Sequence, residues 1–238
     1  EFRRVLFRSG QAAARRMSVP RRMGVLGGTF DPVHLGHLDA AAAARAALAL
    51  DEILFVPTHD PPHKPTLPRT GAFHRFALVA LAIQDTPGYR ASDMELARKG
   101  TSYTVDTLRA LHAVGWRAAQ LFFIIGADAF AEIAVWREYP LMLDLAHFVV
   151  VARPGTTVED ALANTPDLRS RARLASNRAS EDGTTGIYLV EARTRNVSST
   201  TVRARLTEGH ATDELVPPAV ARHIATHHLY RTADDLHG

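Results

Sequence analysis

The chain has 238 residues, of which 46% are hydrophobic, and its formal net charge is +3; this length is enough for one sizeable hydrophobic core. The absence of cysteine excludes disulfides, thiolate zinc sites and cysteine nucleophiles, and the lack of a long uninterrupted apolar stretch argues against a membrane span. We therefore expect a single soluble domain in a reducing cytoplasm, with no membrane partner.

Residues 1–22 are expected to form a disordered tail, and the domain is expected to span residues 23–238. Five arginines and one glutamate give residues 1–16 a net charge of +4, which leaves −1 for the remainder of the chain. The remainder therefore lacks a broad basic field, and we expect no nucleic-acid partner. Because the sequence does not begin with methionine, and Met17 and Met23 are both plausible starts, we interpret the tail as a cloning remnant or a mis-set start.

The segment that follows the tail predicts a strand, a glycine loop and the start of a helix. Met23–Leu26 is a short apolar run, and Leu38–Leu50 is rich in alanine, which favours a helix. Between them lies Gly27–His37, in which glycines allow a close approach of phosphate oxygens and the helix start attracts an anion. His34 and His37 can donate hydrogen bonds to a polyphosphate at the same place. A glycine pair or a surface histidine alone would be weak evidence, but the complete string is specific.

Strand-like and helix-like segments alternate along the rest of the chain. The expected strands are Glu52–Val56, Leu121–Ile125, His147–Ala152 and, more weakly, Ile187–Val190; the expected helices are His74–Gln84, Tyr103–Ala113, Ser199–Glu208 and Pro218–His228. This order predicts an α/β fold with a doubly wound, mainly parallel Rossmann-like sheet and helices on both faces. Residues 156–186 are polar and weakly patterned, and we interpret them as a variable surface excursion.

Four further polar clusters follow strand ends or precede helices, where ligands bind in such sheets. They are Pro57–Lys64, Thr101–Leu108, Ile125–Phe130 with the later Trp136, and Val197–Arg203. Each also has an ordinary interpretation. The first could be a surface loop, the hydroxyls of the second could be N-caps, and Trp136 could be a core residue.

In this order, the motifs resemble those of the nucleotidyltransferase superfamily and, within it, the bacterial nicotinate-nucleotide adenylyltransferase family. The superfamily motif His-x-Gly-His appears at 34–37, and the family's Pro-Pro-His-Lys appears at 61–64. Its Ser-Tyr-Thr with a later Asp-Thr-Leu matches residues 102–108, its Gly-x-Asp with a downstream tryptophan matches 126–136, and its Arg-Pro-Gly matches 153–155. The Ile-Ser-Ser-Thr-x-Ile-Arg motif appears at 197–203 with two valines. The resemblance runs from about Met23 to about Tyr230.

The resemblance implies transfer of AMP from ATP to nicotinate mononucleotide, without a covalent intermediate, in NAD biosynthesis. It implies catalytic roles for His34 and His37. The implied ATP-binding residues are Gly27, Gly28, Thr29, Phe30, Gly126, Asp128, Arg153, Ser198, Ser199, Thr200 and Arg203. The implied mononucleotide-binding residues are Lys64, Ser102, Tyr103, Thr104, Trp136 and Arg137. Mg²⁺ is expected to accompany ATP as the cofactor, and no metal ligands are expected in the protein itself.

Three other functions remain as alternatives. A related adenylyltransferase or cytidylyltransferase would share the first motif but match the later ones poorly. A regulator that binds nucleotides without turnover would not need the second histidine, and an RNA-binding module is disfavoured by the near-neutral charge outside the tail. The sequence leaves open whether the chain forms a homo-oligomer.

Overall fold

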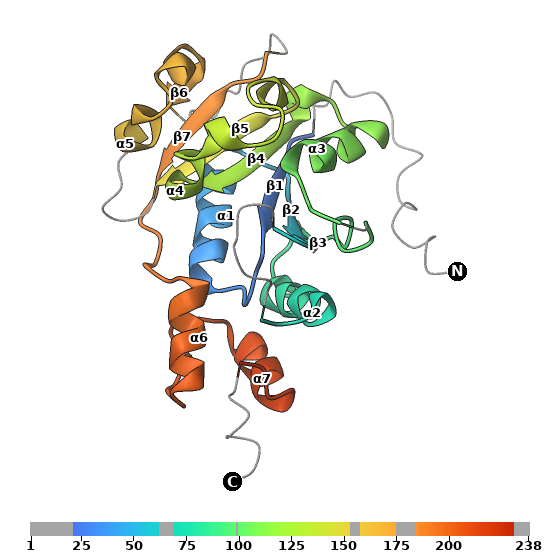
Figure 1. Cartoon of the computed structure of the whole chain (residues 1–238), viewed down its shortest axis with the longest axis vertical. Helices are drawn as coiled ribbons and strands as arrows, with labels where there is room; N and C mark the ends of the chain where they lie inside the picture. Colours follow the sequence, from blue (N-terminus) through green and yellow to red (C-terminus); the bar gives the residue numbers. More distant parts are fainter. Residues whose placement is uncertain (1–20, 62–68, 99, 153–157, 175–183, 231–238) are drawn as a thin grey trace.

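Seven parallel strands form one sheet, in the order β3-β2-β1-β4-β5-β7-β6 (Figure 1). The computed structural model describes residues 21–61, 69–98, 100–152, 158–174 and 184–230. The predicted tail therefore lies almost entirely outside the described residues. The strands are β1 Met23–Gly28, β2 Glu52–Pro57, β3 Tyr89–Ala91, β4 Leu121–Gly126, β5 His147–Ala152, β6 Ala172–Leu174 and β7 Ile187–Glu191.

The direction of the chain across the sheet reverses at β1, which pairs with β2 on one side and with β4 on the other. Such a reversal opens a crevice beyond the carboxyl ends of the two neighbouring strands, where ligands bind in doubly wound sheets. Here the ends in question are Gly27 and Gly28 of β1 and Gly126 of β4. The predicted doubly wound, parallel α/β fold is thus confirmed.

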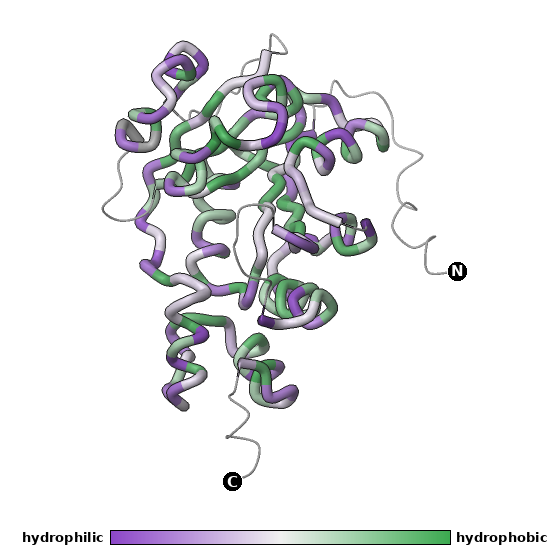
Figure 2. The backbone as a smooth tube through the Cα atoms, in the orientation of Figure 1, coloured by the Kyte–Doolittle hydropathy of each residue, from purple (hydrophilic) through white to green (hydrophobic). Residues whose placement is uncertain are grey.

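Helices cover both faces of the sheet and bury two hydrophobic cores. They are α1 Leu35–Leu48, α2 Ala72–Ile83, α3 Thr104–Ala113, α4 Ala127–Phe130, α5 Val158–Ala163, α6 Ser199–Thr207 and α7 Pro218–Thr226. Residues of α3 pack on one face with Phe123 of β4, whereas residues of α1, α2, α6 and α7 pack on the other face with Phe122. Both faces of the central strands are therefore apolar, and Figure 2 shows hydrophobic residues gathered along the strands in the middle of the sheet.

Four of these strands and helices are not predicted by the sequence analysis: β3, α4, α5 and β6. The two strands have three residues each, α4 has four and α5 has six, which is too short for a periodic pattern to stand out. Two of these elements lie within the expected excursion at 156–186, where β6 extends the sheet by pairing with β7. Among the described residues, no helix is long and apolar enough to cross a membrane.

Candidate active site

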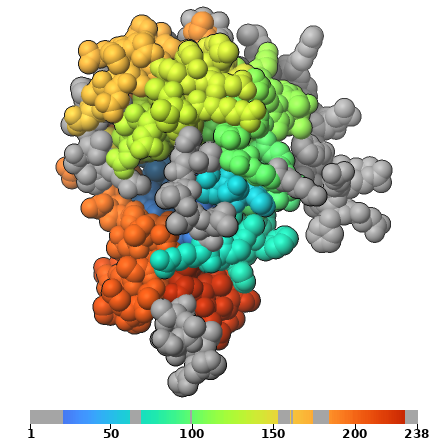
Figure 3. Space-filling view, in the orientation of Figure 1, coloured from blue at the N-terminus to red at the C-terminus, as the bar shows by residue number. Residues whose placement is uncertain are grey.

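A cavity of about 380 Å³ lies at the carboxyl ends of β1 and β4. Its size is in the range that accommodates small-molecule ligands. In Figure 3, atoms of the blue N-terminal elements lie at the bottom of a hollow between the yellow-green segment and the orange C-terminal helix. The cavity therefore occupies the position that the sheet topology predicts for a ligand.

One end of the cavity is formed by the loop after β1 and the start of α1. The backbone N–H of His34, the N-cap of α1, donates a hydrogen bond to Nδ1 of His37 over 3.2 Å. The two imidazole rings lie side by side, with centroids 3.7 Å apart, and Phe30 meets the ring of His37 edge-on at 4.9 Å. The helix therefore begins at Leu35, three residues before its predicted start.

Gly36, between the two histidines, makes room for the ring of His34. A Cβ atom on Gly36 would lie 3.1 Å from Nδ1 of His34 and 3.2 Å from the carbonyl oxygen of Arg195. Both distances are shorter than ordinary van der Waals contact. The glycine of the His-x-Gly-His motif therefore has a packing reason in addition to the general freedom of a glycine backbone.

Phe30 belongs to the hydrophobic core, and its side chain does not line the cavity. Its φ is 48°, a left-handed conformation that is uncommon for a residue with a bulky side chain. The ring lies under Gly28, where a Cβ would be 3.2 Å from the ring. The ring of Phe30 therefore packs against the glycine loop at Gly28.

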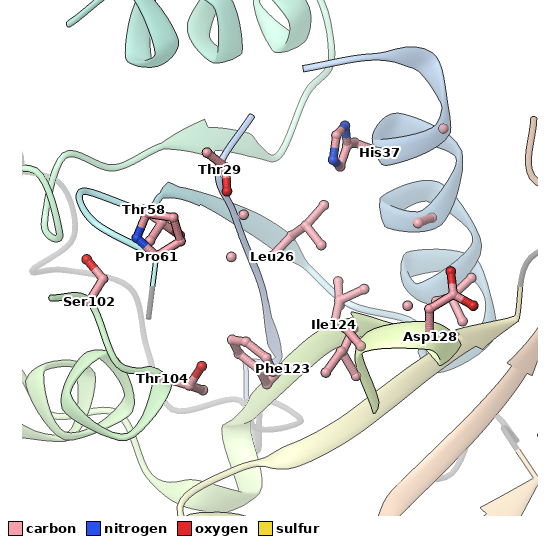
Figure 4. A pocket seen from close by; sticks show the side chains of 18 of the residues that line it. Leu26, Thr29, His37, Thr58, Pro61, Ser102, Thr104, Phe123, Ile124 and Asp128 are labelled. Atoms are coloured by element: carbon pink, nitrogen blue, oxygen red, sulfur yellow. The ribbon is translucent and has the colours of Figure 1, made fainter. Parts of the chain in front are cut away.

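The other end of the cavity is formed by the loop after β2, the start of α3 and the segment after α4. Figure 4 shows Ser102 and Thr104 on the side of the cavity opposite His37, with Phe123 beside Thr104 and Asp128 on the side of α1. Trp136 also lines this end and meets Phe123 edge-on at 6.3 Å. A partly exposed indole at a cavity wall leaves an aromatic surface for a ligand, so packing alone does not explain this residue.

The hydroxyl cluster before α3 does not serve as an N-cap. The N-cap residue is Tyr103, and its side chain makes no capping bond. Instead, Ser102 Oγ accepts a hydrogen bond from the N–H of His59 at 3.1 Å, and its own N–H donates to the carbonyl of Asp60 at 2.9 Å. The N–H of Asp106 donates to the carbonyl of Tyr103 at 3.1 Å, so Thr104, the first residue of α3, is the one whose backbone N–H is offered to a ligand at the cavity wall.

Arg137 brings positive charge to the same end. Its guanidinium lies 4.7 Å from the centre of the Tyr103 ring and 3.7 Å from a carboxylate oxygen of Asp106. The side chain is about half exposed, so the ion pair with Asp106 contributes little to stability. Arg137 and the N-terminus of α3 together favour an anionic group at this end.

Glu95 is a buried carboxyl group at the cavity wall that the sequence analysis does not identify. Burial raises the pKa of Glu95, whereas hydrogen bonds from Thr107, Ser102 and Thr58 oppose this effect. The hydroxyl of Thr107 donates to Oε1 of Glu95 at 2.5 Å. Glu95 thereby links the loop after β2, the segment before α3 and helix α3 itself.

Arg75 is fully buried in α2 and joins the loops after β1 and β2. Its Nη1 donates to the carbonyl of Thr29 at 2.7 Å and to that of Thr58 at 2.6 Å, and its Nε donates to that of Thr70 at 3.1 Å. Burial lowers the pKa of Arg75, and the Asp31 carboxylate opposes that effect. The sequence does contain a signal, because Arg75 is the lone cation on the apolar stripe of its helix.

The loop after β1 is also held from the C-terminal side by α6. Arg203 Nη1 donates to the carbonyl of Asp31 at 2.7 Å, and Ser199 Oγ donates to that of Pro32 at 2.9 Å. The Asp31 carboxylate in turn accepts a hydrogen bond from the hydroxyl of Tyr230 at 2.9 Å. Burial, with Asp31 beside it, raises the pKa of Tyr230. These contacts attach the C-terminal helices to the glycine loop.

Two further contacts fix the segment before α6. Ser198 is the N-cap of α6, and its side chain accepts a hydrogen bond from the N–H of Thr201 at 3.0 Å. The guanidinium of Arg195 forms a two-pronged ion pair with Asp39 of α1, with both N–O distances at 3.0 Å. Arg195 lines the cavity, and its position was not predicted.

The structure brings most of the predicted site residues together around one cavity. Those that line it are Gly27, Gly28, Thr29, His34, His37, Ser102, Tyr103, Thr104, Gly126, Asp128, Trp136 and Arg137. Those that are described but do not line it are Phe30, Ser198, Ser199, Thr200 and Arg203. Lys64 and Arg153 lie outside the described residues. Contacts of any of these residues with a substrate remain predictions.

Comparisons with known proteins agree with this geometry. A cytidylyltransferase-like family model matches residues 25–205. A probable nicotinate-nucleotide adenylyltransferase of Desulfitobacterium hafniense is 41% identical over 212 residues, which cover 89% of this chain and 97% of that protein. The protein of the same name from Clavibacter michiganensis is 39% identical over 216 residues, which cover 90% of this chain and 97% of the relative.

A similar fold occurs in a solved structure. Nicotinic acid mononucleotide adenylyltransferase of Plasmodium falciparum, complexed with NaAD, superposes with a TM-score of 0.66 at 18% identity. The superposition covers 88% of this chain and 97% of the solved chain. At this level of identity the likeness concerns the fold alone.

Proposed function

We propose that this chain, which belongs to the cytidylyltransferase-like family and within it to the nicotinate-nucleotide adenylyltransferases, transfers AMP from ATP to nicotinate mononucleotide. The products are nicotinate adenine dinucleotide and pyrophosphate, and the reaction serves NAD biosynthesis. We expect the enzyme to act in the cytoplasm as a single domain, without a nucleic-acid partner. A homo-oligomer remains compatible with this role.

One observation carries the proposal: a single cavity joins two chemically different ends. His34 and His37 lie at the end where α1 begins, and Trp136 and Arg137 lie at the other, next to Phe123 and Tyr103 respectively. The first end suits a polyphosphate, because a helix start and imidazole N–H groups favour an anion. The second offers an aromatic surface next to positive charge, which suits an aromatic ring that carries a carboxylate.

The reaction is an in-line displacement at the α-phosphorus of ATP. A phosphate oxygen of the mononucleotide forms the new P–O bond, and the bond from the α-phosphorus to the oxygen of the leaving pyrophosphate breaks. The attacking phosphate is already ionised, so the protein needs neither a general base nor a covalent intermediate. Its main contribution is to align two anions and offset their repulsion.

His37 is placed to stabilise the charge that develops on the triphosphate. Its Nδ1 accepts a hydrogen bond from the His34 N–H, so the neutral ring carries its proton on Nε2. That Nε2–H donor is fixed in orientation before ATP binds. The backbone of Gly27, Gly28 and Thr29 lies at the same end and offers a close approach to the α-phosphate.

The carboxylate of nicotinate would be bound at the N-terminus of α3. Thr104 is the first residue of that helix and lines the cavity, and Arg137 stands next to Tyr103. A carboxylate held by N–H donors forms charge-assisted hydrogen bonds, whereas the amide of nicotinamide would gain less. We therefore infer a preference for nicotinate mononucleotide.

Mg²⁺ is proposed to reach the site as a complex with ATP. The carboxylates among the described lining residues are Glu95 and Asp128, and no described group of three His, Asp or Glu ligands lines the cavity. This donor set fits Mg²⁺, which binds through substrate phosphates and one or two carboxylates while keeping several waters. The ion would be held mainly by the ATP phosphates and would neutralise part of the triphosphate charge, whereas Asp128 would lie beside the adenosine and its ribose.

Four residues at and near the N-terminus of α6 complete the proposed ATP site. Ser198, Ser199 and Thr200 stand at the start of α6, and Arg203 follows one turn later. In the structure Ser199 and Arg203 bind the loop after β1, whereas Ser198 caps α6 and Thr200 accepts a hydrogen bond from Arg203. Contact of Ser199 with an ATP phosphate therefore requires rearrangement of its hydrogen bond to Pro32. Lys64 and Arg153 remain proposed phosphate and ribose contacts.

Pyrophosphate release in the presence of Mg²⁺ and ATP tests the proposal. Nicotinate mononucleotide, nicotinamide mononucleotide and phosphopantetheine are supplied in turn as acceptors. We expect the highest kcat/KM with nicotinate mononucleotide. Turnover of phosphopantetheine alone would identify a different adenylyltransferase, and ATP binding without turnover of any acceptor would identify a regulator.

A further inference from the structure

Three histidines meet where α2 packs against α7. His74 belongs to α2, His223 belongs to α7, and His227 directly follows α7 as its C-cap residue. One ring nitrogen from each side chain lies within 4.8 Å of the corresponding nitrogen of the other two. We call these three residues the three-histidine cluster; none of them lines the cavity.

The geometry of the cluster follows from the packing of the two helices. His223 and His227 are four residues apart and therefore lie on the same face of α7, with ring centroids 4.3 Å apart. Helix α2 packs beside α7, as Figure 1 shows, and brings Nδ1 of His74 to 3.1 Å from Nε2 of His223. The ring of His74 is 4.9 Å from that of His227.

The surroundings of His223 favour its neutral ring. Burial lowers the pKa of His223, and the neighbouring His227 and His74 lower it further. Protonation of all three rings would place like charges next to one another. Neutral imidazoles retain a lone pair, which is the form that binds a metal ion.

We propose that the three-histidine cluster binds one divalent transition-metal ion of the Zn²⁺ type, with water as the fourth ligand. With Zn–N bonds of about 2.0–2.1 Å, two nitrogens of a tetrahedral site are about 3.3 Å apart. The observed separation of 3.1 Å between the nitrogens of His74 and His223 is close to this value. His227 is exposed, so its ring can rotate toward the ion without disturbing the core.

The site is structural rather than catalytic, and it goes beyond the proposed transfer reaction. The bound ion would join α7 to α2. In α2, the residue after His74 is Arg75, which holds the loops after β1 and β2. The core residues Val220 and Ile224 already pack α7 against the same hydrophobic cluster as Leu78. Metal binding would therefore stabilise a contact that exists, and would leave the cavity unchanged.

Direct metal binding to the untagged protein tests the proposal. After treatment with EDTA and its removal, the protein is titrated with Zn²⁺ by calorimetry, and with Co²⁺ by visible absorption. We expect one saturable site and the intense absorption bands of tetrahedral Co²⁺. At a free Zn²⁺ concentration of 100 times Kd, the melting temperature should rise by about 5 °C or more.

Two variants and one control assign the ligands. His227→Asn and His223→Asn should each weaken Zn²⁺ binding at least about tenfold and abolish most of the thermal shift. His210→Asn is the matched control, because His210 is an exposed C-terminal histidine outside the cluster. Equal melting temperatures in EDTA and unchanged pyrophosphate release show that the variants are folded.

Two results would overturn the proposal. The first is the absence of a saturable site at micromolar Zn²⁺ in the original protein. The second is Zn²⁺ binding that is unaffected in both His227→Asn and His223→Asn. Neither result depends on which acceptor the enzyme uses.

Discussion

The imidazole rings of His34 and His37 lie with centroids 3.7 Å apart and ring planes inclined by 32°. A backbone hydrogen bond from His34 to Nδ1 of His37 fixes this arrangement at the first turn of α1. The two rings therefore form one preorganised unit, in which the orientation of each depends on the other. This arrangement leads to the first two predictions.

Replacement of His37 by asparagine tests its catalytic role while keeping an acceptor for the backbone N–H of His34. The asparagine amide oxygen can take the place of Nδ1 and accept the His34 N–H, but it cannot extend to the position of Nε2. We expect kcat to fall by about 10²–10³-fold, as for loss of one donor to a developing charge, with little change in the melting temperature or in the Kd for the mononucleotide. A kcat within threefold of the original would show that His37 is not catalytic.

Gly36→Ala tests the packing role of the motif's glycine. The new Cβ would meet His34 Nδ1 at 3.1 Å and the Arg195 carbonyl at 3.2 Å, so the ring must shift. Alanine favours a helix by up to about 1 kcal/mol, which offsets part of the clash in stability. We expect a loss of kcat larger than the change in melting temperature. Gly186→Ala is the control, because its Cβ would have no contact closer than 3.5 Å.

Arg75→Met removes a buried cation without a large loss of volume. The carbonyls of Thr29, Thr58 and Thr70 would lose their donor, and an unsatisfied buried polar group costs about 1–3 kcal/mol. We expect the free energy of unfolding, measured in urea, to fall by about 3 kcal/mol or more, and KM for ATP to rise. Arg205→Met, at an exposed position in α6, should have little effect. Equal effects of the two changes would contradict the role of Arg75.

Glu95→Gln tests the pH dependence that follows from the raised pKa of this carboxyl. Because the pKa is higher in the folded protein than in the unfolded chain, the native state binds the extra proton. The stability from Glu95 is then fully present below the unfolded pKa and is lost as the pH rises through the folded pKa. The original protein should therefore lose stability relative to Glu95→Gln in that interval. The melting temperatures of both proteins are measured between pH 4 and pH 8. A difference between them that stays constant over this range would refute this cause.

Trp136→Ala tests the proposed stacking on the pyridine ring. Loss of the aromatic surface should raise KM for nicotinate mononucleotide about tenfold, which corresponds to about 1.4 kcal/mol. KM for ATP should change less than twofold, because Trp136 lies at the opposite end of the cavity from His37. Trp136→Phe should recover part of the loss. A parallel rise in both KM values would indicate a general structural defect.

Much of the fold follows from local sequence patterns. Runs such as Leu121–Ile125 are apolar at every position, which is typical of strands covered on both faces. The order of strands and helices was enough to predict a doubly wound sheet and the position of the crevice beside Gly27 and Gly126. The short elements β3 and β6 escaped prediction, because three residues contain too little periodicity.

The fold class, the family and most of the motifs around the cavity could be predicted from the amino-acid sequence, because each depends on residues close together in the chain. The polar side chains that support those motifs could be identified only from the packing of distant segments. Arg75 bonds to Thr29, 46 residues away, and Tyr230 bonds to Asp31, 199 residues away. The three-histidine cluster likewise joins residues 149 positions apart. No local pattern encodes such contacts, because they arise when packed helices bring distant side chains within hydrogen-bonding distance.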